Sequence, residues 1–324
     1  MTTPSHAQPP AAGAPAAGSA AASQPRTGTR AAAPTRRRRR RRVDPVYYWF
    51  LVPALVLFSL CIALPAVMGI FYSFTDSIGF GDWEFVGLTN YAVLFSDPGM
   101  LGAYGFTIGV ALVTVILVNI IALLLAIGLT SRIRFRTTLR TIFVLPMVVS
   151  AIIIAFVFQF IFSNTIPAAA EAIGIDALRE SILANPHLAW ISIVLVTTWQ
   201  AIPQAMLIYI AALVTIPGDV YEASSLDGAT PFQQLTRITV PMISGYVLVN
   251  VILGFKNFLS TYDIIVGLTG GGPGTATRSV AMQIFSGFEN GDYAYQMANS
   301  TIFFLITLVI ALFQLRVSRG RTQF

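Results

Sequence analysis

Residues 103–130 read AYGFTIGVALVTVILVNIIALLLAIGLT, a stretch without one charged side chain. A transmembrane helix needs about 20 mostly apolar residues, because each residue rises about 1.5 Å and the hydrocarbon core of a bilayer is about 30 Å thick. The stretch is longer than that minimum. It therefore predicts a membrane-spanning helix, and it sets the frame for interpreting the rest of the chain.

Five further apolar stretches qualify on the same grounds. With the first, they predict six spans, at 46–74, 103–130, 141–163, 188–215, 241–266 and 296–316. The chain of 324 residues has a mean hydropathy of +0.72 and 10% charged residues, against about a quarter in soluble domains. This composition excludes a large soluble enzyme. It predicts an all-α, polytopic membrane protein with six transmembrane helices, whose membrane domain covers residues 46–320.

Arginine residues gather on one side of this domain. Residues 1–44 hold nine of them, and 17 of the 20 basic residues fall on the side of the two termini. By the positive-inside rule, both termini are cytoplasmic in a multi-pass protein of the cell membrane. The Ala- and Pro-rich segment 1–45 lacks the large apolar side chains that offset ordering entropy, so we expect a disordered, polybasic tail.

The run Arg36 to Arg42 could in principle bind nucleic acid, because adjacent guanidinium groups release counterions from phosphates. A polybasic segment directly before a first span is more simply explained by topology and by attraction to anionic lipid. We therefore expect membrane lipid as the partner of the tail, and no nucleic acid.

The small numbers of cysteine, histidine and lysine exclude several classes of site. Cys61 is the only cysteine, and His6 and His187 are too few for a metal site by themselves. A phosphate-binding P-loop needs Gly-Lys followed by Ser or Thr, whereas the only lysine, Lys256, follows Phe255. We expect no catalytic site, no metal and no ATP hydrolysis in this chain. Any energy that the protein uses must come from a partner or an ion gradient.

The loop between the fourth and fifth spans, residues 216–241, carries the strongest local signals. Asp219, with Glu222 three residues later, is spaced as a helix cap, and Gly228 suits the left-handed position that ends a helix. The residues of a second helix start follow: Thr230, Pro231 and Gln233. The loop therefore predicts a helix, a sharp turn and a second helix on the cytoplasmic side.

This loop resembles the EAA motif of ABC-importer permeases, which reads Glu-Ala-Ala, then Gly, then Ile-x-Leu-Pro. The matching residues are Glu222, Ala223, Ser224, Gly228, Ile238, Val240 and Pro241. Ser224 replaces the second Ala of the motif, and Val240 replaces its Leu. A second stretch is similar to the fifth span and following loop of sugar permeases of the oligosaccharide and glycerol-phosphate type: Phe255 to Phe258, Asp263 to Val266, Thr269 to Gly274, and Thr277.

The resemblance covers residues 46–316 and implies a type I ABC-importer permease that moves a sugar or oligosaccharide by alternating access. It also implies a second related permease, two ATP-binding subunits and an extracytoplasmic solute-binding protein. ATP and Mg would be bound by the partner ATPase, with no cofactor in this chain. In that family the EAA loop is the coupling helix seated on the ATPase, which gives these coupling positions: Glu222, Ala223, Ser224, Asp227, Gly228 and Ala229.

Polar residues inside the spans are candidates for a solute path, because a charge at membrane depth is costly. Lys256 is placed about midway along the fifth span, with Asp263 on a similar face roughly 10 Å away. Pro203 is expected to interrupt the fourth span. Neutral groups that suit sugar hydroxyls and ring faces surround them: Trp199, Gln200, Gln204, Tyr209, Asn250, Asn257, Ser260, Thr261 and Tyr262.

Other interpretations of these residues stay open. Each neutral side chain could pack between helices instead of meeting solute. Lys256 could snorkel, or pair with a carbonyl group of the partner permease. Lys256 and Asp263 could also couple a proton or ion in a secondary transporter, although the two halves of the chain show no repeat. A phosphorylated solute would make Lys256 more useful.

The glycine-rich stretch after the fifth span is expected on the outer face. Its residues have no Ser, Thr or Lys in an order that cradles phosphate, so a nucleotide is not expected there. The backbone must turn tightly at Gly271, Gly272 and Pro273, and the resemblance implies that this loop lies beside the docking binding protein.

Overall fold

The computed structural model describes residues 45–131 and 133–319. The tail expected at 1–45 lies outside these residues except for Pro45. The chain divides into two units after Pro53, so that α1 begins in the first unit and the helices after it belong to the second, Ala54–Phe324. In the described part the backbone is nearly all helical, and one isolated β-bridge joins Thr75 to Phe85.

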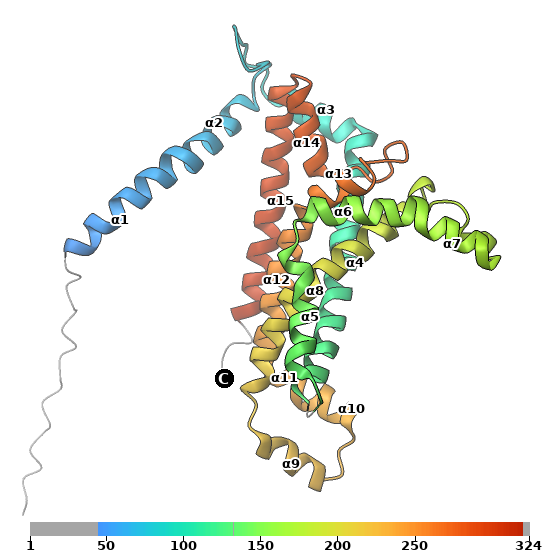
Figure 1. Cartoon of the computed structure of the whole chain (residues 1–324). Coiled ribbons are helices and arrows are strands. Elements are labelled where there is room, and N and C mark those ends of the chain that lie inside the picture. Colours follow the sequence, from blue (N-terminus) through green and yellow to red (C-terminus); the bar gives the residue numbers. More distant parts are fainter. Residues whose placement is uncertain (1–44, 132, 320–324) are drawn as a thin grey trace, which may run out of the picture. The chain divides into compact units, whose positions relative to one another are not determined.

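The helices are shown in Figure 1. Their bounds are α1 (Pro45–Phe58), α2 (Leu64–Tyr72), α3 (Thr89–Ser96), α4 (Pro98–Thr130), α5 (Arg136–Val148), α6 (Ala151–Phe160), α7 (Ile166–Ile173), α8 (Ala189–Val214), α9 (Gly218–Leu226), α10 (Pro231–Gln234), α11 (Val240–Met242), α12 (Ser244–Leu259), α13 (Asp263–Leu268), α14 (Val280–Glu289) and α15 (Tyr293–Arg319). Short π-helices join three pairs: Ser59–Ala63, Ile161–Thr165 and Leu235–Thr239.

Five stretches in the described residues are long and apolar enough to span a membrane: Trp49–Tyr72, Pro98–Thr130, Ala151–Ile173, Ala189–Val214 and Tyr293–Arg316. A sixth is a bent pair, Pro231–Met242 followed by Ser244–Leu259, with 72° between its halves. The expected six spans are therefore present by length and composition when the bent pair counts as one.

The core forms where α4, α8 and α12 lie side by side (Figure 1). Small side chains such as Ala122 on α4 and Ala212 on α8 are fully buried, which lets the helix backbones approach closely. Tyr209 and Met206 of α8 fill the space between these helices. A second apolar cluster joins α6 to α13, and the two clusters together hold the elements that carry the polar side chains described below.

The third predicted span, 141–163, is wrong as a single helix. The chain breaks between α5 and α6, where Val149 is extended with φ −86° and ψ 138°. Gln200 donates a hydrogen bond to the freed Val149 carbonyl at 3.4 Å. At the other end of α5, Arg140 donates to the Leu129 carbonyl at 2.8 Å, which holds α5 against the end of α4. An uncharged run does not reveal such a break, and the candidate span moves to Ala151–Ile173.

The fifth predicted span, 241–266, also needs correction. Its helix α12 ends at Leu259, and α13 starts separately at Asp263. The reason is packing: α13 buries Ile264 and Leu268 against α6. Gly267 lies so close to α6 that a Cβ there would be 2.7 Å from the Cβ of Ala155. Lys256 is consequently in the last turn of α12 and not midway along a span.

Pro203 does not interrupt the fourth span. It stands inside α8, which runs without a break from Ala189 to Val214, and it is buried. A proline in a helix interior removes one backbone hydrogen bond, but α8 continues through Pro203, which is packed away from solvent.

Candidate functional site

The predicted helix, turn and helix are present in residues 218–234, which we call the knob. In Figure 1 the knob, made of α9 and α10, lies at the far end of the helices from α14. Gly228 has φ +77°, and its N–H donates to the Ser225 carbonyl at 3.1 Å, while the Ala229 N–H donates to the Ser224 carbonyl at 3.0 Å. This pair of bonds is a Schellman motif, so the expected left-handed glycine at the end of α9 is confirmed.

The two expected helix starts differ in outcome. Thr230 and Gln233 form the predicted capping box, with Gln233 Oε1 accepting from the Thr230 N–H at 2.8 Å and Thr230 Oγ1 accepting from the Gln233 N–H at 3.3 Å. The Asp219 cap is wrong: the capping residue is Pro217, and no side chain caps α9. Asp219 lies in the first turn, where its negative charge interacts favourably with the positive end of the helix dipole.

A clasp between α9 and α10 holds the knob together. The Gln234 Nε2 donates to Ser224 Oγ at 3.0 Å and to Ser225 Oγ at 3.0 Å. Ser224 is buried, and its hydroxyl donates to the Tyr221 carbonyl at 2.9 Å. Ser224, the departure from Glu-Ala-Ala, therefore accepts a bond that an alanine could not. Sequence reasoning missed Gln234, because its partner lies on the other helix of the knob.

The surface of the knob holds most of the predicted coupling positions. Exposed side chains or backbone are found at Glu222, Ala223, Asp227 and Gly228, whereas Ala229 is half-buried and Ser224 faces inward. Two large apolar side chains join them, Leu226 at 90% exposure and Phe232 at 72%. Phe232 was not predicted as a surface position of the knob. The signal that could have identified it is a large aromatic residue in the first turn of a short polar helix.

A cavity of about 300 Å³ lies among α8, α12 and α13, and we call it the large cavity. Its polar lining consists of Thr197, Gln200, Gln204, Asn257, Ser260, Thr261, Tyr262 and Asp263. Apolar walls complete it: Met147, Ala151, Ala201, Phe258 and Ile264. The break between α12 and α13 places four consecutive residues, 260–263, on this lining, which a continuous helix would have spread over all its faces.

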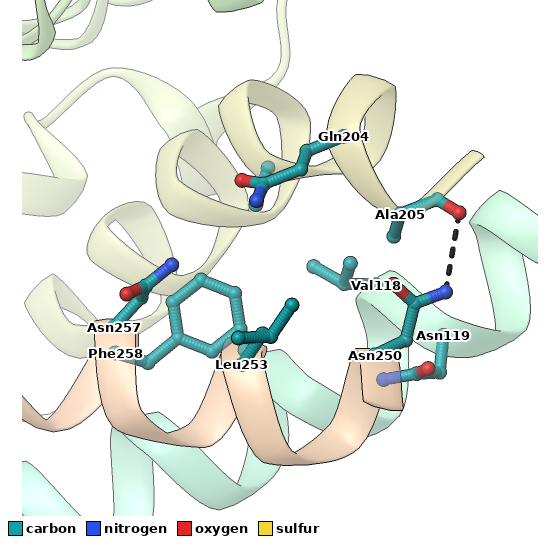
Figure 2. Close-up of a pocket in the computed structure, with 10 residues that line it drawn as sticks. Val118, Asn119, Gln204, Ala205, Asn250, Leu253, Asn257 and Phe258 are labelled. Carbon is teal, nitrogen blue, oxygen red and sulfur yellow. Dashed lines mark hydrogen bonds between the residues drawn. The ribbon is translucent and has the colours of Figure 1, made fainter. Parts of the chain in front are cut away.

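A second space of about 40 Å³, the small cavity, adjoins it (Figure 2). Gln204 and Asn257 line both cavities, and the small one adds Asn119 from α4 and Asn250 from α12. Its volume is enough for water, which needs roughly 10–15 Å³ and several polar partners.

Hydrogen bonds fix the amides of the small cavity. The Asn250 Nδ2 donates to the Ala205 carbonyl at 3.2 Å, the dashed line in Figure 2. The Tyr209 hydroxyl donates to Asn119 Oδ1, and the Asn119 Nδ2 donates to the Val115 carbonyl at 2.7 Å. Sequence reasoning missed Asn119; its signal was the single amide side chain in the uncharged stretch 103–130.

Two predicted solute-path residues lie outside these cavities. Lys256 is exposed and lines neither cavity, because it lies about 100° around α12 from Asn257. Trp199 is 42% exposed, and its ring packs against Phe158 with centroids 5.3 Å apart. The structure thus gathers Gln204, Asn250, Asn257, Tyr262 and Asp263 around the cavities, and separates Lys256 from Asp263.

The glycine-rich loop is tightly held. Thr277 is fully buried, and its Oγ1 donates to the Gly272 carbonyl at 2.6 Å and lies 2.8 Å from Thr269 Oγ1. Gly271 has φ +84°, and a Cβ there would lie 2.9 Å from Arg278 Cγ. The tight turn expected at Gly271 and Gly272 is present, followed by Pro273.

Comparisons with known proteins agree with this architecture. The permease MsmF of the multiple sugar-binding transport system of Streptococcus mutans is 30% identical over 277 residues, which is 84% of this chain and 96% of MsmF. The probable starch degradation products permease AmyD of Thermoanaerobacterium thermosulfurigenes is 32% identical, over 85% of this chain and 95% of AmyD. None of these relatives supports a secondary transporter.

The fold is shared with a chain of a solved bacterial alginate ABC transporter in complex with an alginate pentasaccharide-bound periplasmic protein. That chain superposes with a TM-score of 0.75 at 22% identity, covering 86% of this chain and 96% of its own length. The family model "Binding-protein-dependent transport system inner membrane component" matches residues 118–321, which is more than half of the chain and includes the knob and both cavities. The chain therefore belongs to this family and is a multi-pass inner membrane permease subunit of an ABC importer.

Proposed function

We propose that this permease subunit carries a sugar or oligosaccharide across the membrane by alternating access, with the two cavities as part of its path. The observation that carries the proposal is the lining of the large cavity by neutral amides and hydroxyls and one tyrosine. Sugar hydroxyls both donate and accept hydrogen bonds, as amides and hydroxyls do, and ring faces pack on aromatic side chains. The names of MsmF and AmyD, which concern sugars and starch products, support the same substrate class.

Solute contacts fall to the cavity residues. Gln204 and Asn257 border both cavities and contact solute in the large one, while Asn250 lines the small cavity, whose volume is enough for water. Tyr262, at the break between α12 and α13, offers its ring, which already packs on Phe285 with centroids 4.8 Å apart. Lys256 and Trp199 serve packing or partner contacts instead.

Energy comes from partners. The knob docks on an ATP-binding subunit that holds ATP and Mg, and Leu226 and Phe232 supply apolar contacts there. A second permease completes the path, and two ATP-binding subunits drive it. The positive-inside rule supports a cytoplasmic knob and cytoplasmic termini. The loop of Gly271, Gly272 and Pro273 then lies on the outer side, where the solute-binding protein delivers solute.

Reconstitution tests the proposal. The chain is tagged at its C-terminus, purified in mild detergent with its bound subunits, and placed in proteoliposomes with its binding protein and labelled maltooligosaccharides. We expect a second permease and an ATP-binding subunit to co-purify, and uptake to require ATP. Gln204→Leu and Asn257→Leu should raise KM for solute. Uptake that needs only an ion gradient, or that is unchanged in both variants, would contradict the proposal.

A further inference from the structure

The large cavity carries one sign of charge. Within the described part of the chain, Asp263 is the only charged residue among those that line it, and it is exposed. The only ion pair among the described residues joins Arg179 to Asp176 at 3.0 Å, so no cation there neutralises the Asp263 carboxylate. The single lysine, Lys256, lines neither cavity.

The backbone fixes this separation. Asp263 is the first residue of α13, and the next two residues, Ile264 and Ile265, are buried with 4% and 1% exposure. Buried neighbours hold the start of α13 in place and leave the carboxylate on the cavity side. Lys256 is in a different helix, α12, whose cavity face is given by Asn250 and Asn257. The two charges therefore act on different surfaces.

We propose that this cavity selects solute by charge: it admits neutral and cationic polyhydroxylated solutes, such as neutral or amino sugars, and excludes anionic ones, such as phosphorylated, sulfonated or uronic-acid sugars. A carboxylate accepts hydrogen bonds from sugar hydroxyls, and these charge-assisted bonds are stronger than neutral ones. An anion beside it is repelled, and a cavity with apolar walls focuses that field. This inference rests on the proposed function only in taking the cavity as part of the solute path.

A thiol probe measures the sign of the field without transport. In the full chain assembled with its partners, Cys61→Ser removes the natural thiol and Ser260→Cys places one on the cavity lining. The rates of modification by a cationic trimethylammonium methanethiosulfonate and an anionic sulfonate methanethiosulfonate are compared, each relative to free cysteine in solution. We expect the cation to be favoured by about fivefold, because the carboxylate acts on the two reagents with opposite sign over roughly 8 Å of water.

Variants assign the field to its source. Asp263→Asn should bring the ratio to about 1. Lys256→Gln changes the charge by one unit with the opposite sign, at a residue outside the cavity, and should leave the ratio near fivefold. Thr261→Cys repeats the measurement at a second lining position, should Ser260→Cys fail to assemble. A ratio at or below one in the parent, a ratio that changes in Lys256→Gln and not in Asp263→Asn, or no reaction with either reagent with or without ATP would overturn the proposal. Because no uptake is measured, a fivefold ratio in a chain that does not import sugar would leave the charge selection standing and refute only the proposed function.

Discussion

The Nε2 of Gln234 lies 3.0 Å from the Oγ of Ser224 and joins the two helices of the knob across the turn at Gly228. The two helices of the knob are therefore held together by side-chain bonds and are not loosely linked. Their connection rests on these bonds as well as on the backbone of the turn.

Replacing Gln234 by leucine should weaken coupling. The change removes two hydrogen bonds, each worth about 0.5–1.5 kcal/mol, while keeping the size of the side chain. We expect the rate of uptake to fall about fivefold or more, with assembly intact and ATP hydrolysis less affected. Ser224→Ala is the matched control, because Gln234 keeps its bond to Ser225, and its effect should be smaller. Equal uptake in wild type and Gln234→Leu would refute a role for the clasp.

Gly228 allows a separate test of the turn itself. A β-branched residue at φ +77° costs about 1–2 kcal/mol or more, although no heavy atom would lie within 4 Å of an added Cβ. The penalty is therefore conformational and not steric. Gly228→Val should abolish most uptake while membrane insertion continues, and Gly228→Asn should retain it, because asparagine tolerates the left-handed region. Loss of uptake in both variants would point to a steric contact with the ATPase instead.

Local chemistry explains what was predictable in the knob. The capping box at Thr230 and the left-handed Gly228 depend on residues within a few positions of each other, so the sequence predicted both. The Asp219 cap failed because Pro217 and Gly218 start the helix two residues earlier. The clasp could not be predicted, since it needs the angle between two helices.

The spans, too, have features that local sequence predicts and features that it does not. Hydropathy depends on composition alone, and it predicted the stretch 103–130 and its companions. It cannot report a bend inside an uncharged run, which is why the breaks at Val149 and after Leu259 were missed. The second break decides the site, because it separates Lys256 from Asp263.

Neighbouring residues on α12 should therefore behave differently. Lys256→Ala should leave the KM for solute near that of wild type, because Lys256 lines neither cavity. Asn257→Leu should raise KM about tenfold, since an amide partner of a solute hydroxyl is worth about 1–2 kcal/mol and Asn257 lines both cavities. Initial uptake rates over a range of solute concentrations give both values. A KM that rises only in Lys256→Ala would move the solute path to the other face of α12.

The contact between α13 and α6 should control the stability of the cavity. A Cβ at Gly267 would lie 2.7 Å from the Cβ of Ala155 and 2.9 Å from Ile152 Cδ1, so the helices must separate to accept it. Overpacking of this kind typically costs about 1–3 kcal/mol. We expect Gly267→Ala to lower the Tm of the detergent-solubilised importer and to reduce uptake, because α13 carries Asp263 into the cavity lining. Gly245→Ala in α12 is the matched control: no heavy atom lies within 4 Å of its added Cβ, and alanine favours the helix by about 1 kcal/mol over glycine. Its Tm should stay equal or rise, and a Gly267→Ala protein as stable as this control would show that α6 and α13 are not tightly packed.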